Sequence, residues 1–200
     1  GDYGTLTVNK TTGSYDYSLA ANAEQSSKVQ ALKEAEAVVD EFTISVSDES
    51  LSGSESITFK ISGANDAPTS VSLANTSVNE NAAGAVVGQL SAVDVDGDAL
   101  TYELSTVSAD DSDLFTINSD NALELKSTTT LNTEDASTHV VTVLVSDGTA
   151  TTTKTFTIQV SDQNDPATGT VAITGDTFIT GTLTAAPTIT DEDGMGSLSY

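Results

Sequence analysis

The chain has no cysteine, tryptophan or arginine, and six lysines face thirty acidic residues in a length of 200. Without cysteine, disulfide bonds and thiolate metal sites are excluded, while the cellular compartment stays open. The formal net charge of -24 disfavours nucleic acid and anionic membranes as partners, because both are themselves negatively charged. The acids are spaced between strand-like runs rather than blocked together, which favours a folded chain over a disordered one.

Long apolar runs are also missing, and none approaches the ~20 residues that span a bilayer. The opening GDYGTLTV shows neither the basic nor the apolar part of a secretory signal. We therefore expect no membrane insertion and an internal piece of a longer protein. Aromatic residues make up only 5%, so each folded module must bury a thin core of Val, Ile and Leu, which bound metal can reinforce.

Two stretches, residues 42–66 and 141–165, align with each other without a gap. Each reads as two strands of alternating apolar and polar residues joined by a turn, and each ends in Asn-Asp shortly before a proline. The alignment sets Asp48 on Asp147. A period of about one hundred residues is the length of one β-sandwich. The repeat therefore predicts an all-β array of tandem modules.

Three segments are predicted: 1–66, 67–166 and 167–200. The middle segment contains a full set of strand-like runs, at 70–74, 77–80, 86–93, 100–105, 114–118, 122–126, 140–147 and 155–160. The first segment contains runs at 3–8, 15–19, 42–47 and 56–62, with a short helical crossover within 21–42 whose Val29, Leu32 and Ala35 would face inward. The last segment contains runs at 169–175, 178–185 and 197–200. We expect the middle segment to be one whole domain and the two flanks to be incomplete.

The run Asp94-Val95-Asp96-Gly97-Asp98 lies between two predicted strands, so alternate carboxylates of one loop converge. Such carboxylates repel each other by about 1 kcal/mol per pair at ~4 Å in water and by about 4 kcal/mol at an intermediate dielectric. A divalent cation would relieve the repulsion, and calcium accepts more protein oxygens than magnesium does. For this loop alone, a solvated turn rich in aspartate is an equal alternative.

A second loop repeats the pattern as Asp191-Glu192-Asp193-Gly194. Each loop follows an acidic linker, which is Asn65-Asp66 for the first and Asp162-Gln163-Asn164-Asp165 for the second. Glu80 and Glu134 are further acids that a sandwich would place at its ends. Because one arrangement is built twice, we favour calcium sites over solvated turns.

These residues carry a family resemblance. The middle segment resembles the cadherin-like domain of giant, RTX-type surface adhesins of bacteria. The first segment, with GTLTVNKTTGSYDY, VQAL, DEFTISVSD and GAND, is similar to the later part of a VCBS repeat. The last, from GTVAITG to DEDGMGSLSY, is similar to the start of a bacterial immunoglobulin-like module. The resemblance implies tandem immunoglobulin/cadherin-like β-sandwiches with calcium-binding linkers.

The resemblance also implies a ligand set. The second junction would use Glu80, Glu134, Asp162, Asn164, Asp165, Asp191 and Asp193, and the first would use Asn65, Asp66, Asp94, Asp96 and Asp147, with Glu34 or Glu36 as weaker candidates. Two positions depart from the family pattern. Asn132 stands where the pattern has Asp, although Asp135 can substitute, and Gly63 replaces an Asp of the first linker. The first junction would accordingly hold fewer ions.

The implied function is that of an extracellular, calcium-dependent extender module at the bacterial cell surface, serving adhesion or biofilm formation. Its partners would be the neighbouring modules of the same chain. We expect no enzyme, because His139 is the only histidine, placed at a strand start as an exposed or edge residue, and no GxSxG motif occurs. The alternatives are a carbohydrate- or protein-binding module of such an adhesin, and a domain attached to a secreted hydrolase. Tyr3, Tyr15 and Tyr17 pack within the first segment or form a small sugar platform.

Overall fold

The computed structural model describes residues 1–48, 50–106, 109–175, 183–194 and 196. They form two compact units. The first unit contains the described residues of Gly1–Ser72, Leu90–Glu103 and Val143–Lys154, and the second those of Leu73–Gln89, Leu104–Thr142 and 155–200. The division of the chain into segments 1–66, 67–166 and 167–200 stays a prediction.

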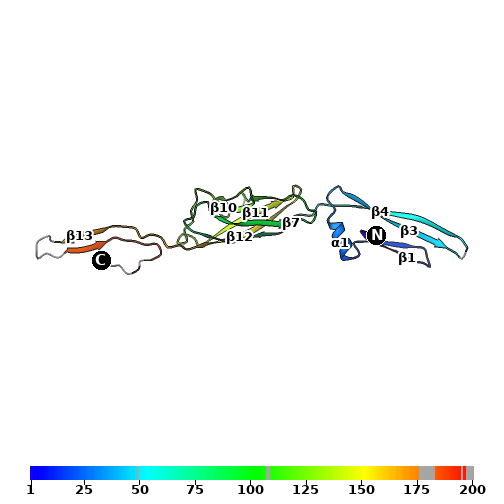
Figure 1. Ribbon diagram of the computed structural model, residues 1–200, viewed down its shortest axis with the longest axis horizontal. Helices are drawn as coiled ribbons and strands as arrows, with labels where there is room; N and C mark the ends of the chain where they lie inside the picture. Colours follow the sequence, from blue (N-terminus) through cyan, green and yellow to red (C-terminus); the bar gives the residue numbers. More distant parts are fainter. Residues whose placement is uncertain (49, 107–108, 176–182, 195, 197–200) are drawn as a thin grey trace. The chain divides into compact units, whose positions relative to one another are not determined.

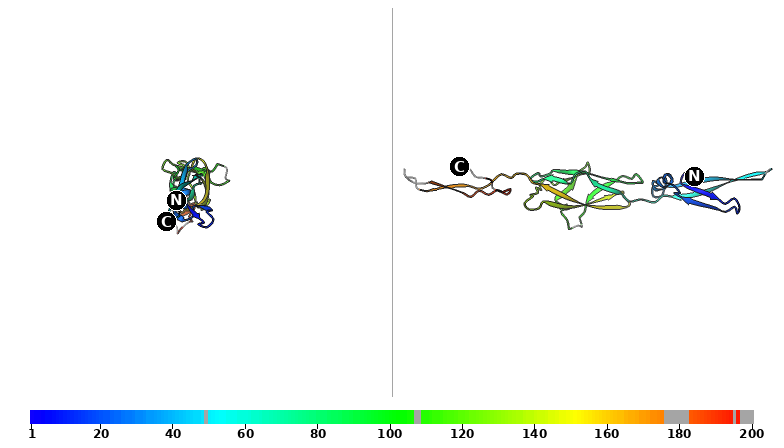
Figure 2. Two further views of the ribbon diagram at one scale, coloured as in Figure 1. Left: turned by 90° about the vertical axis from the view of Figure 1, so that its right-hand side faces the viewer. Right: turned by 90° about the horizontal axis from the view of Figure 1, so that it is seen from below.

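Residues 69–161 form two four-stranded sheets (Figures 1 and 2). One sheet has the order β5 (Thr69–Leu73), β7 (Val86–Val93), β10 (Ala122–Leu125) and β9 (Phe115–Ile117). The other has the order β6 (Ser77–Asn79), β12 (Thr151–Ser161), β11 (Thr138–Ser146) and β8 (Thr101–Leu104). β6 pairs with β12 in parallel, with Val78 opposite Val160. A short 3-10 helix, η1 (Ser112–Leu114), precedes β9.

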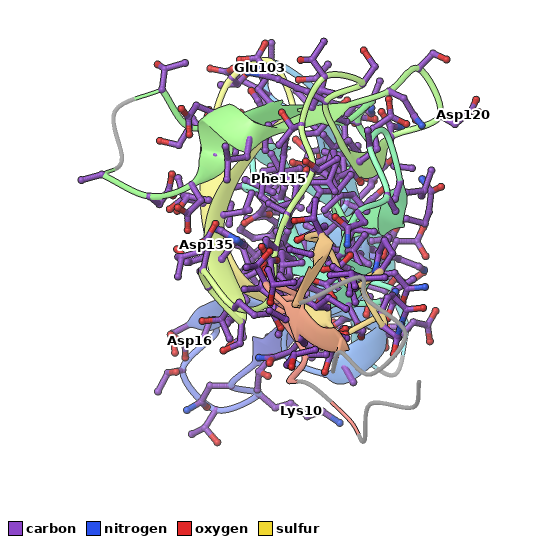
Figure 3. All side chains as sticks on the ribbon, turned by 90° about the vertical axis from the view of Figure 1, so that its left-hand side faces the viewer. Lys10, Asp16, Glu103, Phe115, Asp120 and Asp135 are labelled. Carbon is purple, nitrogen blue, oxygen red and sulfur yellow. The ribbon has the colours of Figure 1, made fainter. Side chains whose placement is uncertain are left out.

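The core of these sheets comes from alternate residues of the strands. In β11, Val141, Val143 and Val145 are fully buried, while the residues between them are partly exposed. Phe115 of β9 lies in the interior, whereas Glu103 and Asp120 lie at the periphery (Figure 3). Each buried side chain of this size contributes about 1.5–3 kcal/mol. The structure contains all the strands predicted for this stretch, because alternation with period two reports one buried face.

The start of the chain forms two hairpins, β1 (Gly4–Val8) with β2 (Tyr15–Leu19), and β3 (Ala37–Ser47) with β4 (Ser52–Ser62). The buried carboxylate of Asp40 accepts hydrogen bonds from the Asp2 backbone N–H at 2.8 Å and from the Tyr17 hydroxyl at 2.9 Å. Burial, the hydrogen bond and the charge of Asp40 together raise the pKa of Tyr17 to about 12. The Tyr17 ring stacks on Phe59, with ring centroids 4.0 Å apart. Tyr17 therefore packs within this segment.

The predicted helical crossover is present as α1 (Ala23–Gln30), which begins where the Asn22 side chain accepts a hydrogen bond from the Gln25 N–H. Val29 is half-buried and Leu32 is buried, but Ala35 is exposed, contrary to expectation, and has a positive φ of 64°. β3 begins at Ala37, earlier than the predicted residue 42. The helix formers at 34–37 obscure the start of this strand, although two β-branched valines, Val38 and Val39, follow Ala37.

The described residues of the last segment include a hairpin of β13 (Val171–Gly175) with β14 (Leu183–Pro187), in which Val171 lies opposite Pro187. β13 is exposed along its whole length. Of the predicted runs, residues 178–182 and 197–200 lie outside the described residues. In the described part of the chain, no helix is long and apolar enough to cross a bilayer.

Candidate metal sites

Three carboxylates gather in the turn after β7, and we call Asp94, Asp96 and Asp98 the first acidic cluster. An oxygen of each lies within 4.8 Å of the others. Gly97 has φ of 71°, a left-handed conformation that allows the chain to turn here. The Asp94 carboxylate accepts the backbone N–H groups of Asp96 at 3.0 Å and Asp98 at 3.3 Å. The loop itself therefore positions the cluster.

Two oxygens of this cluster have no hydrogen-bond donor in the part of the chain that the structure describes. Asp96 is only 5% exposed, and its Oδ2 accepts the backbone N–H of Asp66 at 2.7 Å. Its Oδ1, and Oδ2 of Asp94, are buried without a hydrogen-bond partner among the described residues. Leaving an anionic oxygen buried and unpaired is costly. The first acidic cluster therefore fits a cation.

The charged side chain of Lys33 contacts the first acidic cluster, and a neighbouring pair forms in the first linker. The ammonium of Lys33 binds the Asp98 carboxylate, and this hydrogen bond raises the pKa of Lys33. Asn65 donates from its side-chain amide to Asp147 at 3.0 Å. The N–H of Ala150, followed by this amide, holds the pKa of Asp147 below its usual range. Asn65 and Asp147 thus pair with each other, and the group of acids Asp94, Asp96 and Asp98 does not include Asp147.

The second acidic cluster consists of Glu80, Glu134, Asp162 and Asp193, whose oxygens lie within 4.8 Å of one another. Glu80 follows β6, Asp162 follows β12, and Asp193 belongs to the loop after β14. Glu80 is 2% exposed, and its two oxygens accept the backbone N–H groups of Gln163 and Thr133, each at 2.7 Å. These bonds hold the pKa of Glu80 below its usual range and fix the carboxylate in place.

The other carboxylates of the second acidic cluster repel one another. Asp162 is exposed, yet partial desolvation, followed by the charges of Asp193 and Glu80, raises its pKa. The pKa of Glu134 is lowered by its own backbone N–H, yet burial and the charges of Glu80, Asp162 and Asp193 raise it overall. The cluster therefore carries more negative charge than its surroundings balance, which a divalent cation would neutralise.

An outer group extends this cluster through Glu134, Asp165 and Glu192, whose oxygens also lie within 4.8 Å of one another. Asn132 donates to Glu192 at 3.0 Å, and the Asp165 backbone N–H donates to the Asp193 carboxylate. Asn132, at the position where the family pattern has Asp, thus holds an acid in place. Glu134 belongs to both groups, so the second acidic cluster and its outer group are continuous.

The structure brings together most of the predicted ligands, namely Asp94 and Asp96 in the first cluster, and Glu80, Glu134, Asp162, Asp165 and Asp193 in the second cluster and its outer group. Asp66 reaches Asp96 through its backbone, Asn164 donates to the Asp165 carbonyl, and Asp191 accepts the Asp193 N–H. The sequence-based ligand set omitted Asp98 and Glu192. Each lies inside an acidic loop that is visible in the sequence, so the acidic composition of these loops could have identified both residues. That these residues are metal ligands stays a prediction.

His139 differs from the expectation of an exposed or edge residue. Its strand, β11, lies between β12 and β8, and its side chain is 12% exposed. Its Nδ1 lies 3.4 Å from the Asp111 carboxylate, which also accepts the Val140 N–H at 2.8 Å. The nearby acid explains why a polar ring is tolerated in this half-buried place.

Comparisons with known proteins single out the sandwich. Residues 74–161 match the Cadherin domain. This match covers β6 to β12, and cadherin domains are adhesion-type extracellular modules without enzymatic activity. No curated protein sequence matches the chain.

Solved cadherin structures share the fold. Human protocadherin-24 EC1-2 (form II) is 22% identical, with a TM-score of 0.50 over 79% of this chain and 77% of that one. Protocadherin gamma B2 extracellular cadherin domains 1-5 are 19% identical (TM-score 0.51), over 96% of this chain and 38% of that one. PcdhgB3 EC1-4 is 18% identical (TM-score 0.51), over 94% of this chain and 47% of that one. The chain thus spans less than half of the two longer ectodomains, and the predicted all-β, cadherin-like sandwich fold is confirmed.

Proposed function

We propose that this chain is a calcium-dependent structural segment of an extracellular adhesion protein. In this proposal, calcium at the two acidic clusters ties the cadherin domain to the segments before and after it. The observation that carries the proposal is the convergence of Glu80, Glu134 and Asp162 with Asp193, a residue of the last segment, within 4.8 Å. Four carboxylates so close together repel one another, and a divalent cation would relieve that repulsion.

The chemistry of the clusters favours calcium over other cations. Every side chain in the three groups is a carboxylate, so each group offers hard oxygen ligands and no nitrogen or sulfur. Calcium takes six to eight such oxygens, whereas magnesium keeps several waters. When bound, calcium supplies the positive charge that the clusters lack. Glu80 is held in place by two backbone N–H groups, so it forms a fixed point for the more repelled Glu134 and Asp162.

The biological setting proposed is a secreted, RTX-type adhesin at the surface of a bacterial cell, which serves cell adhesion or biofilm formation. The resemblance of residues 1–66 to a VCBS repeat and of residues 167–200 to an immunoglobulin-like module supports this setting. The match of residues 74–161 to an adhesion-type module is consistent with it. The proposed partners are the neighbouring modules of the same chain. Specific binding of the chain to a glycan array would favour a carbohydrate-binding module instead.

Calorimetric titration of the chelator-treated chain with calcium, together with melting curves, tests the proposal. A ligand that binds only the folded state stabilises it by about 2.7 kcal/mol at a hundredfold excess over Kd. Asp162→Asn should lose calcium binding at the second acidic cluster and most of that stabilisation. Asp120→Asn is the matched control, because Asp120 is exposed and lies at the periphery (Figure 3). Melting curves that superimpose with calcium and with chelator would contradict the proposal.

A further inference from the structure

The turn after α1 presents a lysine to the first acidic cluster. This turn, Leu32–Glu36, is fixed by its own hydrogen bonds: the Glu36 N–H donates to the Lys33 carbonyl at 3.0 Å, and the Lys33 N–H donates to the Glu36 carboxylate at 3.2 Å. The Gly63 N–H donates to the Glu36 carbonyl at 2.9 Å, and Leu32 is only 5% exposed. The backbone that carries Lys33 is therefore anchored.

Gly63 shows how closely this turn approaches the first linker. A Cβ atom at residue 63 would collide with the carbonyl oxygens of Leu32 and Lys33. No side chain fits there, including the aspartate that the family pattern has at this position. The turn that approaches Gly63 carries an ammonium group, that of Lys33, and this ammonium binds Asp98.

The lysine leaves part of the cluster unneutralised. It binds Asp98, whereas the buried Oδ1 of Asp96 and Oδ2 of Asp94 have no hydrogen-bond partner among the described residues. Asp96 is 95% buried, as its exposed fraction is 5%. Within the described chain, the carboxylates of Asp94 and Asp96 therefore still lack a positive partner. The third carboxylate, that of Asp98, is already paired with the ammonium of Lys33.

We propose that Lys33 sets the affinity of the first acidic cluster by competing with the divalent cation for Asp98. Calcium that binds there must displace the ammonium from Asp98 or bind beside it, and both carry a free-energy cost because like charges repel. No such lysine contacts the second acidic cluster among the described residues. The first cluster consequently fills at a higher calcium concentration than the second. This inference rests on the proposed function.

The test compares two lysine variants in a chain whose second cluster is silenced by Glu134→Gln and Asp162→Asn. Lys33→Met should lower the Kd for calcium at the first cluster roughly tenfold, which corresponds to about 1.4 kcal/mol. Lys28→Met is the matched control, since it removes the same charge from the same segment but Lys28 pairs with Asp2 and Glu24. It should leave the Kd within about twofold.

A second measurement compares melting temperatures without calcium and with saturating calcium. In chelator, Lys33→Met should melt at a lower temperature than the parent, because three crowded carboxylates lose their counter-charge, and in saturating calcium the order should reverse. Lys33→Gln, which keeps a polar group, serves as a second variant if the methionine variant folds poorly. Binding by Lys33→Met without binding by the parent would support the inference in its strongest form.

The negative outcomes separate the two claims. If parent and Lys33→Met bind calcium equally, or the variant binds more weakly, the role of Lys33 is overturned while the calcium function stands. If neither binds, and the chain with an intact second cluster does not bind either, the proposed function is overturned as well.

Discussion

The pKa of a single carboxylate in this chain depends on whether its nearest neighbours are hydrogen-bond donors or other acids. Glu80 accepts two backbone N–H groups and has a lowered pKa, whereas Glu134 faces three other acids and has a raised one. Glu80 is therefore a stable anion with or without metal. Glu134 is an anion whose repulsion a bound cation would relieve, so its replacement should report metal binding directly.

Replacing Glu134 by glutamine should change the pH dependence of stability. A carboxyl whose folded pKa is raised stabilises the metal-free fold at low pH, and this stability is lost as pH rises through the raised value. In chelator, Glu134→Gln should therefore melt above the parent near pH 7, and the difference should vanish near pH 4, about the ordinary pKa of Glu. In calcium the parent should melt higher. Melting temperatures measured across this range check the prediction.

The control for this series is Glu103→Gln in β8, which removes the same charge at the periphery (Figure 3). It should follow the parent at every pH. A Glu134→Gln variant that melts below the parent near pH 7 in chelator would show that Glu134 stabilises the metal-free fold and would contradict the repulsion argued here.

Asn132 offers the opposite change, the addition of a carboxylate. Asn132→Asp would replace the donor that holds Glu192 by a like charge, so it should lower the melting temperature in chelator. It should also tighten calcium binding at the outer group, because an acid is restored where the family pattern has one. Asn121→Asp adds the same charge in an exposed turn and is the control. Equal calcium affinity of Asn132→Asp and Asn121→Asp would contradict the prediction.

For single residues, the sequence predicted some side-chain contacts and not others. The spacing of Asp94 and Asp96 within one loop predicts that their carboxylates lie close together, because alternate side chains of a tight turn point to the same side. Lys33 meets Asp98 from 65 residues away, and Asn132 meets Glu192 from 60 residues away. Such contacts depend on how the backbone segments pack, so no local pattern contains them.

Among the elements, strands with one buried face are the ones that the sequence predicts best. β7 was predicted with its observed bounds, because its polar and apolar residues follow the two faces of a sheet. β12 begins at Thr151, before the predicted residue 155, because its first residues are polar on both faces and carry no alternation. β3 was predicted too short for a different reason. Its buried position is an acid, Asp40, which hydrogen bonds rather than apolar contacts stabilise.

Gly88 in β7 tests the packing of an element. A Cβ atom at residue 88 would lie 2.8 Å from the backbone nitrogen of Asn75 and 2.9 Å from its oxygen, so the chain before β6 would have to move. Gly88→Ala should lower the free energy of unfolding by about 1–3 kcal/mol in urea titrations. Gly53→Ala in β4 is the control, because a Cβ there has nothing within 4 Å. It should be neutral or stabilise by up to about 1 kcal/mol. Equal effects of the two substitutions would contradict the close approach.

Across the whole molecule, apolar burial is uneven. The buried apolar residues belong mainly to the sandwich of residues 69–161, whereas Val46 and Leu51 in the first segment and Ile173 in the last are 72%, 76% and 70% exposed. The flanking hairpins consequently have little hydrophobic stabilisation of their own. The net charge of -24 adds repulsion throughout. A cation bound at the acidic clusters would oppose that repulsion where it is strongest.

This view predicts that calcium and simple salt act differently on the chain. Salt screens charges that lie farther apart than the Debye length, about 8 Å at 0.15 M, and screens partly buried groups much less. The carboxylates of the clusters lie within 4.8 Å of one another, so sodium chloride should relieve only the general repulsion and raise the melting temperature modestly. About 1 mM calcium at constant ionic strength should raise it further, and magnesium should do so less. Asp162→Asn should reduce the calcium effect and leave the salt effect intact. If sodium chloride at matched ionic strength reproduces the full effect of calcium, the cation acts by screening alone and the clusters are not sites.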